Sequence, residues 1–326
     1  MYDVSRLPSA LQGLSLPVIA SPMFTVSYPE LVLAQCKAGI VGSFPALNAR
    51  QPELLDEWLT MMKQELDDYR RQHPDAMVGP IAVNQIVHSS NLRLEQDVAT
   101  CIKHQVPIFI TSLRAPVPEI VDAVHAYGGV ILHDVINVKH AKKALDAGVD
   151  GLILVAAGAG GHAGTLSPMA LVGEVRQFFQ GPLVLSGAIS SGDAILAAQA
   201  MGADFAYIGT RFIASQEANA GEPYKNSLIK AGASDIIYSN LFSGVHGNYV
   251  RESIELAGLD PDNLGVADKS IMSFADGRSK AKAWKDIWGA GHGVGQIHEI
   301  LPAGRIVERL KQEYAAARKR LAALPY

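Results

Sequence analysis

The chain has 326 residues, of which 48% are hydrophobic, and it carries a formal net charge of −4 at pH 7. This charge excludes the basic surface that binding to nucleic acid or an anionic membrane requires, while the hydrophobic content suffices for a large buried core. No apolar run approaches the ~20 residues of a membrane span, and the N-terminus lacks the pattern of a signal peptide, so we expect a soluble cytoplasmic protein.

Two cysteines, Cys36 and Cys101, are too few for a disulfide framework or a metal cluster. Both lie in apolar patterns of helical spacing, which predicts buried and unreactive thiols. The sequence therefore predicts no metal site.

Predicted strands and helices alternate along the first two thirds of the chain. The strands cover residues 17–23, 40–46, 80–86, 106–113, 130–135, 152–157, 183–189 and 205–214. The helices between them cover residues 28–39, 52–73, 92–105, 117–128, 138–148, 169–180 and 193–202. Alternation of this kind demands a parallel sheet, and eight units predict a closed (β/α)8 barrel, the TIM-barrel architecture.

The alternation stops after residue 214. Further helical patterns cover residues 223–231, 249–257 and 306–323. We therefore predict a barrel formed by residues 1–214 and 301–326, with a mostly helical insertion, residues 215–300, that covers the C-terminal face of the barrel. Trp284 and Trp288, four residues apart, are predicted to anchor this insertion.

In such barrels the active site lies at the C-terminal ends of the strands. The residues predicted at these ends are Ala20, Ser21, Pro22, Met23, Phe44, Asn84, Gln85, Thr111, Ser112, His133, Asp134, Gly160, Gly161, His162, Ser186, Gly187, Ala188, Gly209 and Thr210. Phosphate groups often bind to backbone N–H groups between the loops that follow the seventh and eighth strands. Ser186-Gly-Ala188 and Gly209-Thr210 occupy these two positions, which predicts a phosphate site.

The sixth predicted strand runs into a glycine-rich loop, Gly158-Ala-Gly-Gly-His162. Glycine lets backbone approach a flat or anionic ligand closely, and histidine can transfer a proton near neutral pH. His162 is therefore the candidate catalytic residue, and a loop histidine bonded only to backbone is the alternative. The glycine spacing also fits a dinucleotide-binding pattern, but the acidic residue that this pattern requires ~20 positions later is missing from the sequence.

Five motifs together resemble the nitronate monooxygenases, formerly called 2-nitropropane dioxygenases. They are Ser21-Pro-Met23, Gly160-Gly-His-Ala-Gly164, Ser186-Gly-Ala188, Ile208-Gly-Thr-Arg-Phe212 and Trp284-Lys-Asp-Ile-Trp-Gly-Ala-Gly-His-Gly-Val-Gly295. The likeness covers most of the chain, in order. The same barrel and histidine loop also occur in flavin-dependent enoyl-ACP reductases and in related NADH:quinone reductases.

The resemblance implies a TIM barrel that binds FMN. The implied FMN contacts are Ala20, Ser21, Pro22, Met23, Asn84, His133, Ala159, Gly160, Gly161, Ser186, Gly187, Ala188, Gly209 and Thr210. The phosphate would lie on the last four of these and the flavin ring against Pro22 and Met23. His162 would match the catalytic histidine of the family. The substrate or lid candidates are Phe44, Ser112 and His292.

The activity that the resemblance implies is the oxidation of an alkyl nitronate, or of a nitroalkane, by O2 to a carbonyl compound and nitrite. His162 would take the α-proton of a nitroalkane or hold the anionic nitronate by a charge-assisted hydrogen bond. The flavin carries the redox step. The implied partners are the small-molecule nitronate and O2, and a homodimer is one assembly that the resemblance allows.

The chain departs from the family pattern at three places. The fourth strand reads Ile110-Thr-Ser-Leu-Arg114, where one subgroup has a histidine flanked by aromatic residues. His133 and Asp134 stand where related quinone reductases have a lysine, and His292 stands where glutamine is frequent. An alternative therefore stays open, an NAD(P)H-dependent flavin reductase of the enoyl-ACP reductase or quinone reductase type on the same barrel.

Overall fold

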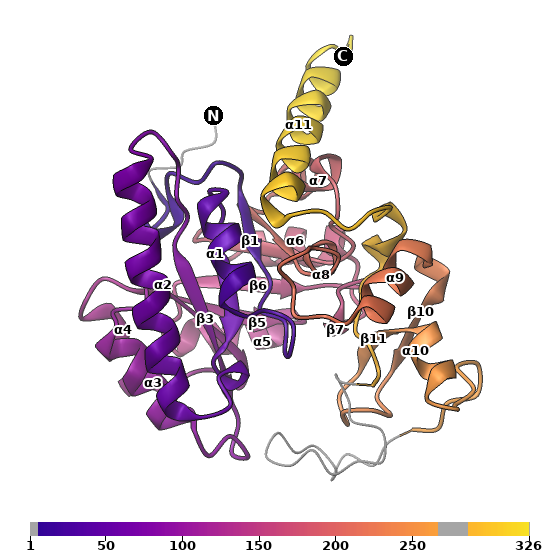
Figure 1. The fold of residues 1–326 in the computed structure, drawn as a ribbon, viewed down its shortest axis with the longest axis horizontal. Coiled ribbons are helices and arrows are strands. Elements are labelled where there is room, and N and C mark those ends of the chain that lie inside the picture. The colour runs from indigo at the N-terminus through magenta and orange to yellow at the C-terminus, as the bar shows by residue number, and fades with distance from the viewer. Residues whose placement is uncertain (1–5, 267–285, 326) are drawn as a thin grey trace.

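A ring of parallel strands forms the centre of the molecule. A computed structural model of the protein describes residues 6–266 and 286–325, and Figure 1 shows its fold. The barrel strands are β1 (Val18–Ala20), β2 (Gly42–Pro45), β3 (Ile81–Val87), β4 (Ile108–Leu113), β5 (Val130–Val135), β6 (Gly151–Val155), β8 (Leu183–Ser186) and β9 (Phe205–Ile208). They are hydrogen-bonded in the order β1-β9-β8-β6-β5-β4-β3-β2, and all pairs are parallel.

A parallel bridge between Ile19 of β1 and Val41, next to β2, closes the ring. The backbone N–H of Ala20 donates to the carbonyl of Val41 at 2.9 Å, and the N–H of Val41 donates to the carbonyl of Val18 at 3.2 Å. The predicted closed (β/α)8 barrel is confirmed.

The helices that connect the strands surround this ring. They are α1 (Pro29–Lys37), α2 (Pro52–Gln72), α3 (Leu94–Lys103), α4 (Pro118–His125), α5 (Val138–Asp146), α6 (Pro168–Arg176) and α7 (Gly192–Met201), with the short turn η3 (Ala46–Asn48) after β2. Proline begins α1, α2, α4 and α6 because its fixed φ suits the first helical position, where its missing N–H costs nothing.

Successive side chains of each barrel strand point alternately into the ring and out toward the helices. The inner cluster includes Ile19, Ala82, Ile108, Ile110, Leu132, Ile153, Val184 and Tyr207. The outer cluster includes Phe44, Val83, Phe109, Ile131, Leu154, Leu185 and Ala206. Leu11, in the short turn η2 (Ser9–Leu11), and Leu7, just before it, join the inner cluster. The N-terminal segment therefore fills one end of the ring.

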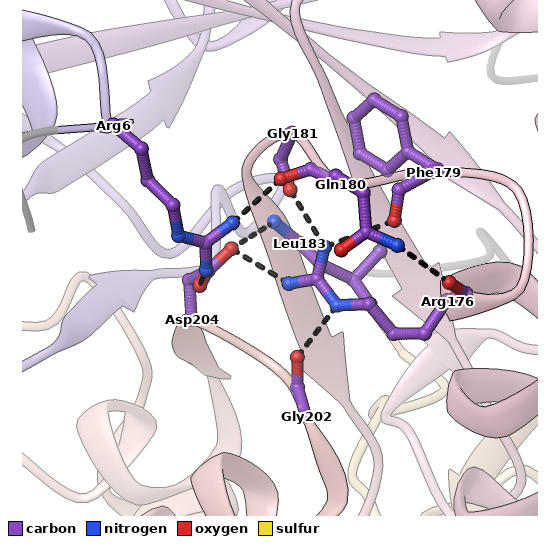
Figure 2. Close-up of polar contacts among 8 residues, drawn as sticks. All are labelled: Arg6, Arg176, Phe179, Gln180, Gly181, Leu183, Gly202 and Asp204. Carbon is purple, nitrogen blue, oxygen red and sulfur yellow. Dashed lines mark hydrogen bonds and ion pairs between the residues drawn. The ribbon is translucent and has the colours of Figure 1, made fainter. Parts of the chain in front are cut away.

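A buried carboxylate holds this end of the barrel together (Figure 2). Asp204, directly before β9, accepts hydrogen bonds of 2.8 Å from Nη2 of Arg176 and from the backbone N–H of Leu183. It also pairs with Arg6 of the N-terminal segment, and Arg176 donates through Nε to the carbonyl of Gly202 at 2.7 Å. Because the Asp204 side chain has no exposed surface, its charge depends on these partners.

The chain leaves the barrel and returns to it at one place. Ser215 forms a parallel bridge with Leu301, just before the last helix, α11 (Ala303–Ala322). Between them the described residues form α9 (Glu222–Lys230), η4 (Ala233–Asp235), β10 (Ile236–Ser239), β11 (Gly247–Val250), α10 (Arg251–Leu256) and η6 (His292–Gln296). In Figure 1 these orange and yellow elements lie together, on the other side of the barrel from α2, α3 and α4.

Several predicted boundaries are displaced, and at two of them the predicted element extends into an element of another kind. The eighth strand ends at Ile208 instead of residue 214, because Gly209 and Thr210 lead directly into a short helix, α8 (Thr210–Ile213). The helix predicted over residues 249–257 begins at Arg251, because the residues before it form β11. In both places apolar residues stand before and after the true boundary and conceal it.

The strand β11 belongs to a small antiparallel sheet outside the barrel. It pairs with β10 on one side and with β7 (Gly161–His162) on the other. Glycine at position 247 permits the second pairing, because a Cβ there would lie only 2.8 Å from the carbonyl oxygen of Gly161. The sequence predicted a mostly helical insertion and located no strand in it, so this sheet is a finding of the structure.

Some remaining predictions concern single residues. Both cysteines are free and buried, as predicted, and burial raises the pKa of the Cys36 thiol to about 12. Trp288 stacks on Tyr224 with ring centroids 5.2 Å apart, while Trp284 lies outside the described residues. Within the described ranges, no helix combines the length and the apolar composition that crossing a bilayer requires.

Candidate active site

The small sheet fixes the histidine loop at the C-terminal ends of the barrel strands, which we call the mouth. His162 is paired with Gly247 and Gly161 with Asn248 in the antiparallel register of β7 and β11. The side-chain amide of Asn248 also donates to the carbonyl of Ala159 at 2.6 Å. The insertion, far away in sequence, therefore holds the loop that carries the candidate catalytic residue.

The imidazole of His162 is part of a hydrogen-bond network with the insertion. Its Nε2 lies 2.8 Å from Oγ of Ser243, which donates to the carbonyl of Val245 at 3.0 Å and lies 3.3 Å from the hydroxyl of Tyr249. Because the Ser243 hydroxyl donates its proton to the carbonyl of Val245, its oxygen accepts a hydrogen bond from Nε2–H of His162. In this tautomer the neutral ring has its lone pair on Nδ1. Burial of the ring lowers the pKa of His162 to about 4, so the imidazole is neutral at pH 7.

Five glycines at the mouth form what we call the glycine cradle: Gly158, Gly160, Gly187, Gly209 and Gly291. A Cβ on Gly160 would lie 2.8 Å from the backbone N of Gly291, and a Cβ on Gly187 would lie 2.7 Å from the carbonyl oxygen of Ala157. At Gly209 a Cβ would lie 3.2 Å from Cβ of Ser21 and 3.4 Å from Sδ of Met23. Backbone segments from four parts of the chain thus approach as closely as glycine allows.

The donors predicted for a phosphate are partly engaged within the protein. The backbone N–H of Ala188 donates to the carbonyl of Gly158 at 3.2 Å, so this amide is occupied. The hydroxyl oxygen of Thr210 accepts from the backbone N–H of Gly291 at 2.9 Å, which leaves the hydroxyl proton available to a ligand. Gly209 and Thr210 also start α8, directly after the eighth barrel strand, where phosphate sites of TIM barrels lie.

The loop after β1 is fixed by one buried side chain. Nδ2 of Asn48 donates to the carbonyls of Met23 (3.1 Å) and Ser27 (2.8 Å), while its Oδ1 accepts from the backbone N–H of Thr25. Thr25 has a φ of 64°, a left-handed conformation that non-glycine residues seldom adopt. The loop is therefore held in one shape beside Ser21.

Left-handed backbone recurs around the mouth. Leu113 and Ala188, at the ends of β4 and β8, have φ values of 76° and 55°. Such conformations cost free energy and persist where the surrounding structure imposes them, often at functional sites. Together with Thr25, these residues give three strained positions, one in the last residue of a barrel strand and two in the loops that follow other barrel strands.

A cluster of hydrogen-bonded polar side chains lies inside the ring at its mouth. Nδ2 of Asn84 donates to Oγ of Ser112 at 2.7 Å, and Ser112 donates to Oδ2 of Asp134 at 2.6 Å. The other carboxyl oxygen of Asp134 and the hydroxyl of Tyr207 are buried without a hydrogen-bond partner among the described residues. Desolvation raises the pKa of Asp134 to about 7, only partly offset by the bond from Ser112.

Two residues predicted at the site lie elsewhere. Leu132 points inward and Ile131 outward, so Asp134 faces the ring while His133 faces the helices, where its Nδ1 lies 2.8 Å from Oγ1 of Thr111. Phe44 also faces outward and meets Trp58 of α2 edge-on at 5.9 Å. The structure therefore removes His133 and Phe44 from the candidate site.

Three other predicted residues can be placed by their contacts. Ser21 donates its backbone N–H to the carbonyl of Ile208 at 2.9 Å, which joins the ends of β1 and β9. His292 is exposed at the start of η6, and its backbone N–H donates to the carbonyl of Gly158 at 2.9 Å. Ser186 faces the ring from the end of β8, opposite Tyr207 in the register.

Sequence reasoning missed Ser243, Asn248 and Tyr207. The first two lie in the insertion, where no periodicity or motif points to the histidine loop, and Tyr207 lies inside an apolar strand. Among the described residues, no group of three or more histidine, cysteine, aspartate or glutamate side chains is placed to hold a metal ion.

Comparison with known proteins places this geometry in a family. The chain is 25% identical to the nitronate monooxygenase of Paraburkholderia phytofirmans, over 93% of each chain. It is 28% identical to the (3aS,4S,5R,7aS)-5-hydroxy-7a-methyl-1-oxo-octahydro-1H-indene-4-carboxyl-CoA dehydrogenase of Rhodococcus jostii, covering 84% of this chain and 72% of that one. Among solved structures, FabK from Thermotoga maritima shares the fold with a TM-score of 0.76 and 24% identity, over 97% of this chain and 98% of that one.

The family model of nitronate monooxygenase matches residues 56–313, which run from α2 through the histidine loop and the insertion into α11. The match thus includes His162, Ser243 and the whole glycine cradle. The chain belongs to the nitronate monooxygenase family and is an oxidoreductase.

Proposed function

We propose that the protein is an FMN-dependent nitronate monooxygenase that uses O2 to oxidise alkyl nitronates to carbonyl compounds and nitrite. The observation that supports this most is His162, a neutral imidazole held at the barrel mouth by Ser243. Membership of the family implies a flavin, and FMN in particular is part of our proposal.

The glycine cradle supports FMN as the cofactor. Gly187 and Gly209 follow the seventh and eighth barrel strands, where phosphate sites of TIM barrels lie, and a Cβ at either position would press on atoms of the protein itself. Thr210 would donate its hydroxyl proton to that phosphate, and Met23 and Ser21 lie against Gly209, on the β1 side of the mouth. Bound there, FMN supplies the redox chemistry of the oxidation.

The state of His162 favours a nitronate over a nitroalkane as the substrate. An imidazole whose pKa is about 4 is a weak base, so it is poorly suited to remove the α-proton of a neutral nitroalkane. An anionic nitronate needs no deprotonation, and its charge favours the protonated, hydrogen-bonding form of the ring. We propose that His162 orients the nitronate through a hydrogen bond, and that the described part of the insertion, residues 215–266 and 286–300, covers the site.

Three measurements on the purified protein test this proposal. It should be yellow with a flavin spectrum, release nitrite from an alkyl nitronate in air, and lose most of that release in His162→Gln. The exposed His140→Gln is the matched control and should keep wild-type activity. A colourless folded protein that does not take up FMN would refute the proposal, and so would an unchanged nitrite yield in His162→Gln.

A second candidate is an NAD(P)H-dependent flavin reductase acting on a thioester. It is favoured by an apolar rim on one half of the mouth, formed by the exposed side chains of Leu92, Leu113, Val117, Ile136, Leu166 and Met169. These residues follow β3, β4, β5 and β6–β7, and such a rim suits a long apolar acyl group. The carboxyl-CoA name of the Rhodococcus relative is consistent with it.

Anaerobic mixing separates the two candidates. Bleaching of the flavin by an alkyl nitronate but not by NADH or NADPH supports the monooxygenase. Bleaching by a nicotinamide nucleotide alone, with reoxidation by an enoyl thioester, supports the reductase and rejects our first proposal.

A further inference from the structure

A cavity of about 400 Å3 lies between the start of α7, α8, η6 and α11. Ser190 and Arg211 are its most buried polar residues, Ile306 and Leu310 are apolar, and His298 and Arg309 are exposed at its edge. Its lining includes neither His162 nor any glycine of the cradle, so the proposed flavin site contributes no residue to it.

Arg211 is a buried cation with an unfilled donor. Its exposed fraction is 3%, and its Nη1 has no hydrogen-bond partner among the described residues. A guanidinium does not lose its proton at ordinary pH, so it cannot reduce the cost of burial by becoming neutral. The hydroxyl of Ser190, 4% exposed, is likewise buried without a partner among the described residues. Two unused donors therefore line one cavity.

The nearby acids already have other partners. The carboxylate of Glu313 accepts from the backbone N–H of Gly192 at 2.8 Å, and Asp193 pairs with Arg320. Glu299 pairs with Arg309 at 2.7 Å. Burial, and next the positive charge of Arg309, lower the pKa of Arg211, while the negative charges of Glu313 and Glu299 oppose this shift.

We propose that this cavity binds a small oxyanion, a carboxylate or a phosphate, held by Arg211 and Ser190. The planar fork of a guanidinium matches two oxygens of either group, and a serine hydroxyl adds a third donor. The two sources differ in the rest of the ligand. Ile306 and Leu310 would contact the aliphatic part of a short carboxylate, whereas inorganic phosphate would leave them untouched.

The ligand would lie close to the segment that holds the histidine loop. Gly293 of η6 is packed against Ser190, because a Cβ there would lie 2.3 Å from the Ser190 hydroxyl oxygen. The preceding residue, His292, donates its backbone N–H to Gly158. An oxyanion bound to Ser190 and Arg211 therefore stabilises the joining of η6, α11 and the barrel.

The test titrates inorganic phosphate and, separately, butyrate into the purified protein by calorimetry and thermal unfolding, with chloride keeping the ionic strength constant. At least one of the two should bind and raise the unfolding midpoint of the wild type. Arg211→Met should abolish both responses, yet be at least as stable as wild type without anions, because it removes an unpaired buried charge. Ser190→Ala should weaken binding about tenfold through loss of one hydrogen bond to an ion.

The matched control is Arg305→Gln, which removes the same charge from an exposed position of α11 outside this cavity. It should bind like the wild type. Responses of equal size in Arg211→Met and wild type would mean a general effect of anions on the protein surface and would overturn the proposal. Absence of binding by both phosphate and butyrate would also overturn it. If Arg211→Met does not fold, the Ser190→Ala titration decides by the same criteria.

Discussion

The hydroxyl oxygen of Ser243 lies 2.8 Å from Nε2 of His162, although 81 residues separate them in the chain. Ser243→Ala removes this partner and should lower kcat for nitronate oxidation about tenfold, because one hydrogen bond to a reacting group is worth about 1–2 kcal/mol. Steady-state kinetics measure this, with the exposed Ser234→Ala as the control. Equal kcat values in both variants would show that Ser243 does not set the state of His162.

Buried His133 makes the fold sensitive to acid. Burial lowers its pKa from 6.5 to about 4, so protonation favours the unfolded chain. Its contribution to stability is complete above pH 6.5 and is lost as pH falls from 6.5 toward 4, by about 3 kcal/mol in total. Urea unfolding at pH 7 and pH 4.5 should show a smaller loss in His133→Gln than in wild type. An identical loss in both would contradict this account.

The opposite pH dependence applies to Asp134. Burial raises its pKa from 3.8 to about 7, so the folded protein favours the protonated acid and loses stability as pH rises from 3.8 through 7. Asp134→Asn should therefore be more stable than wild type at pH 8, by about 2–4 kcal/mol, and similar to it at pH 4. Thermal unfolding across this range measures the difference. A larger advantage of the variant over the wild type at pH 4 than at pH 8 would contradict the expected sign.

Two glycine substitutions test the cradle. An Ala at position 160 would place its Cβ 2.8 Å from backbone N of Gly291, so Gly160→Ala should retain much less flavin after purification. Gly173→Ala, in the exposed part of α6 with no atom within 4 Å of the new Cβ, should retain all of it and gain about 0.5–1 kcal/mol of stability. Flavin absorbance per protein is the measurement. Equal flavin content would exclude the cradle from cofactor binding.

The buried carboxylate of Asp204 should dominate the stability of the N-terminal end. Asp204→Ala leaves Arg6 and Arg176 without their partner and should cost about 3–5 kcal/mol. Asp262→Ala breaks an exposed pair with Arg251 and should cost much less, because water screens an exposed pair. Denaturant unfolding of both variants compares them. Similar costs would mean that the pairing in Figure 2 contributes no more than a surface ion pair.

The sequence predicted the ring of strands well because each strand is a short apolar run between glycine or polar boundaries. The same property concealed which side chains face inward: strands buried on both faces show no alternation. His133 and Phe44 were therefore assigned to the site although they point to the helices. Asp134, which does face the ring, could not be distinguished from His133 by pattern alone.

The pairing of His162 with Gly247 was beyond sequence reasoning for a different reason. A two-residue strand carries no periodic signal, and its partner lies in an insertion that had been predicted as helical. Ser243 and Asn248 reach the histidine loop only through this long-range pairing. The glycines around His162 predicted a close approach of the backbone to a ligand, and they gave no sign of the pairing with β11.

The bridge between Ser215 and Leu301 has a consequence for how such enzymes diversify. Because the insertion begins and ends at adjacent points of the barrel, its length and sequence can change while the barrel strands keep their register. The insertion contributes Ser243, which contacts His162. Replacing the insertion would therefore alter the chemistry of the imidazole as well as access to it. Grafting the insertion of another protein between Ser215 and Leu301 would therefore be a direct way to give this barrel a new substrate.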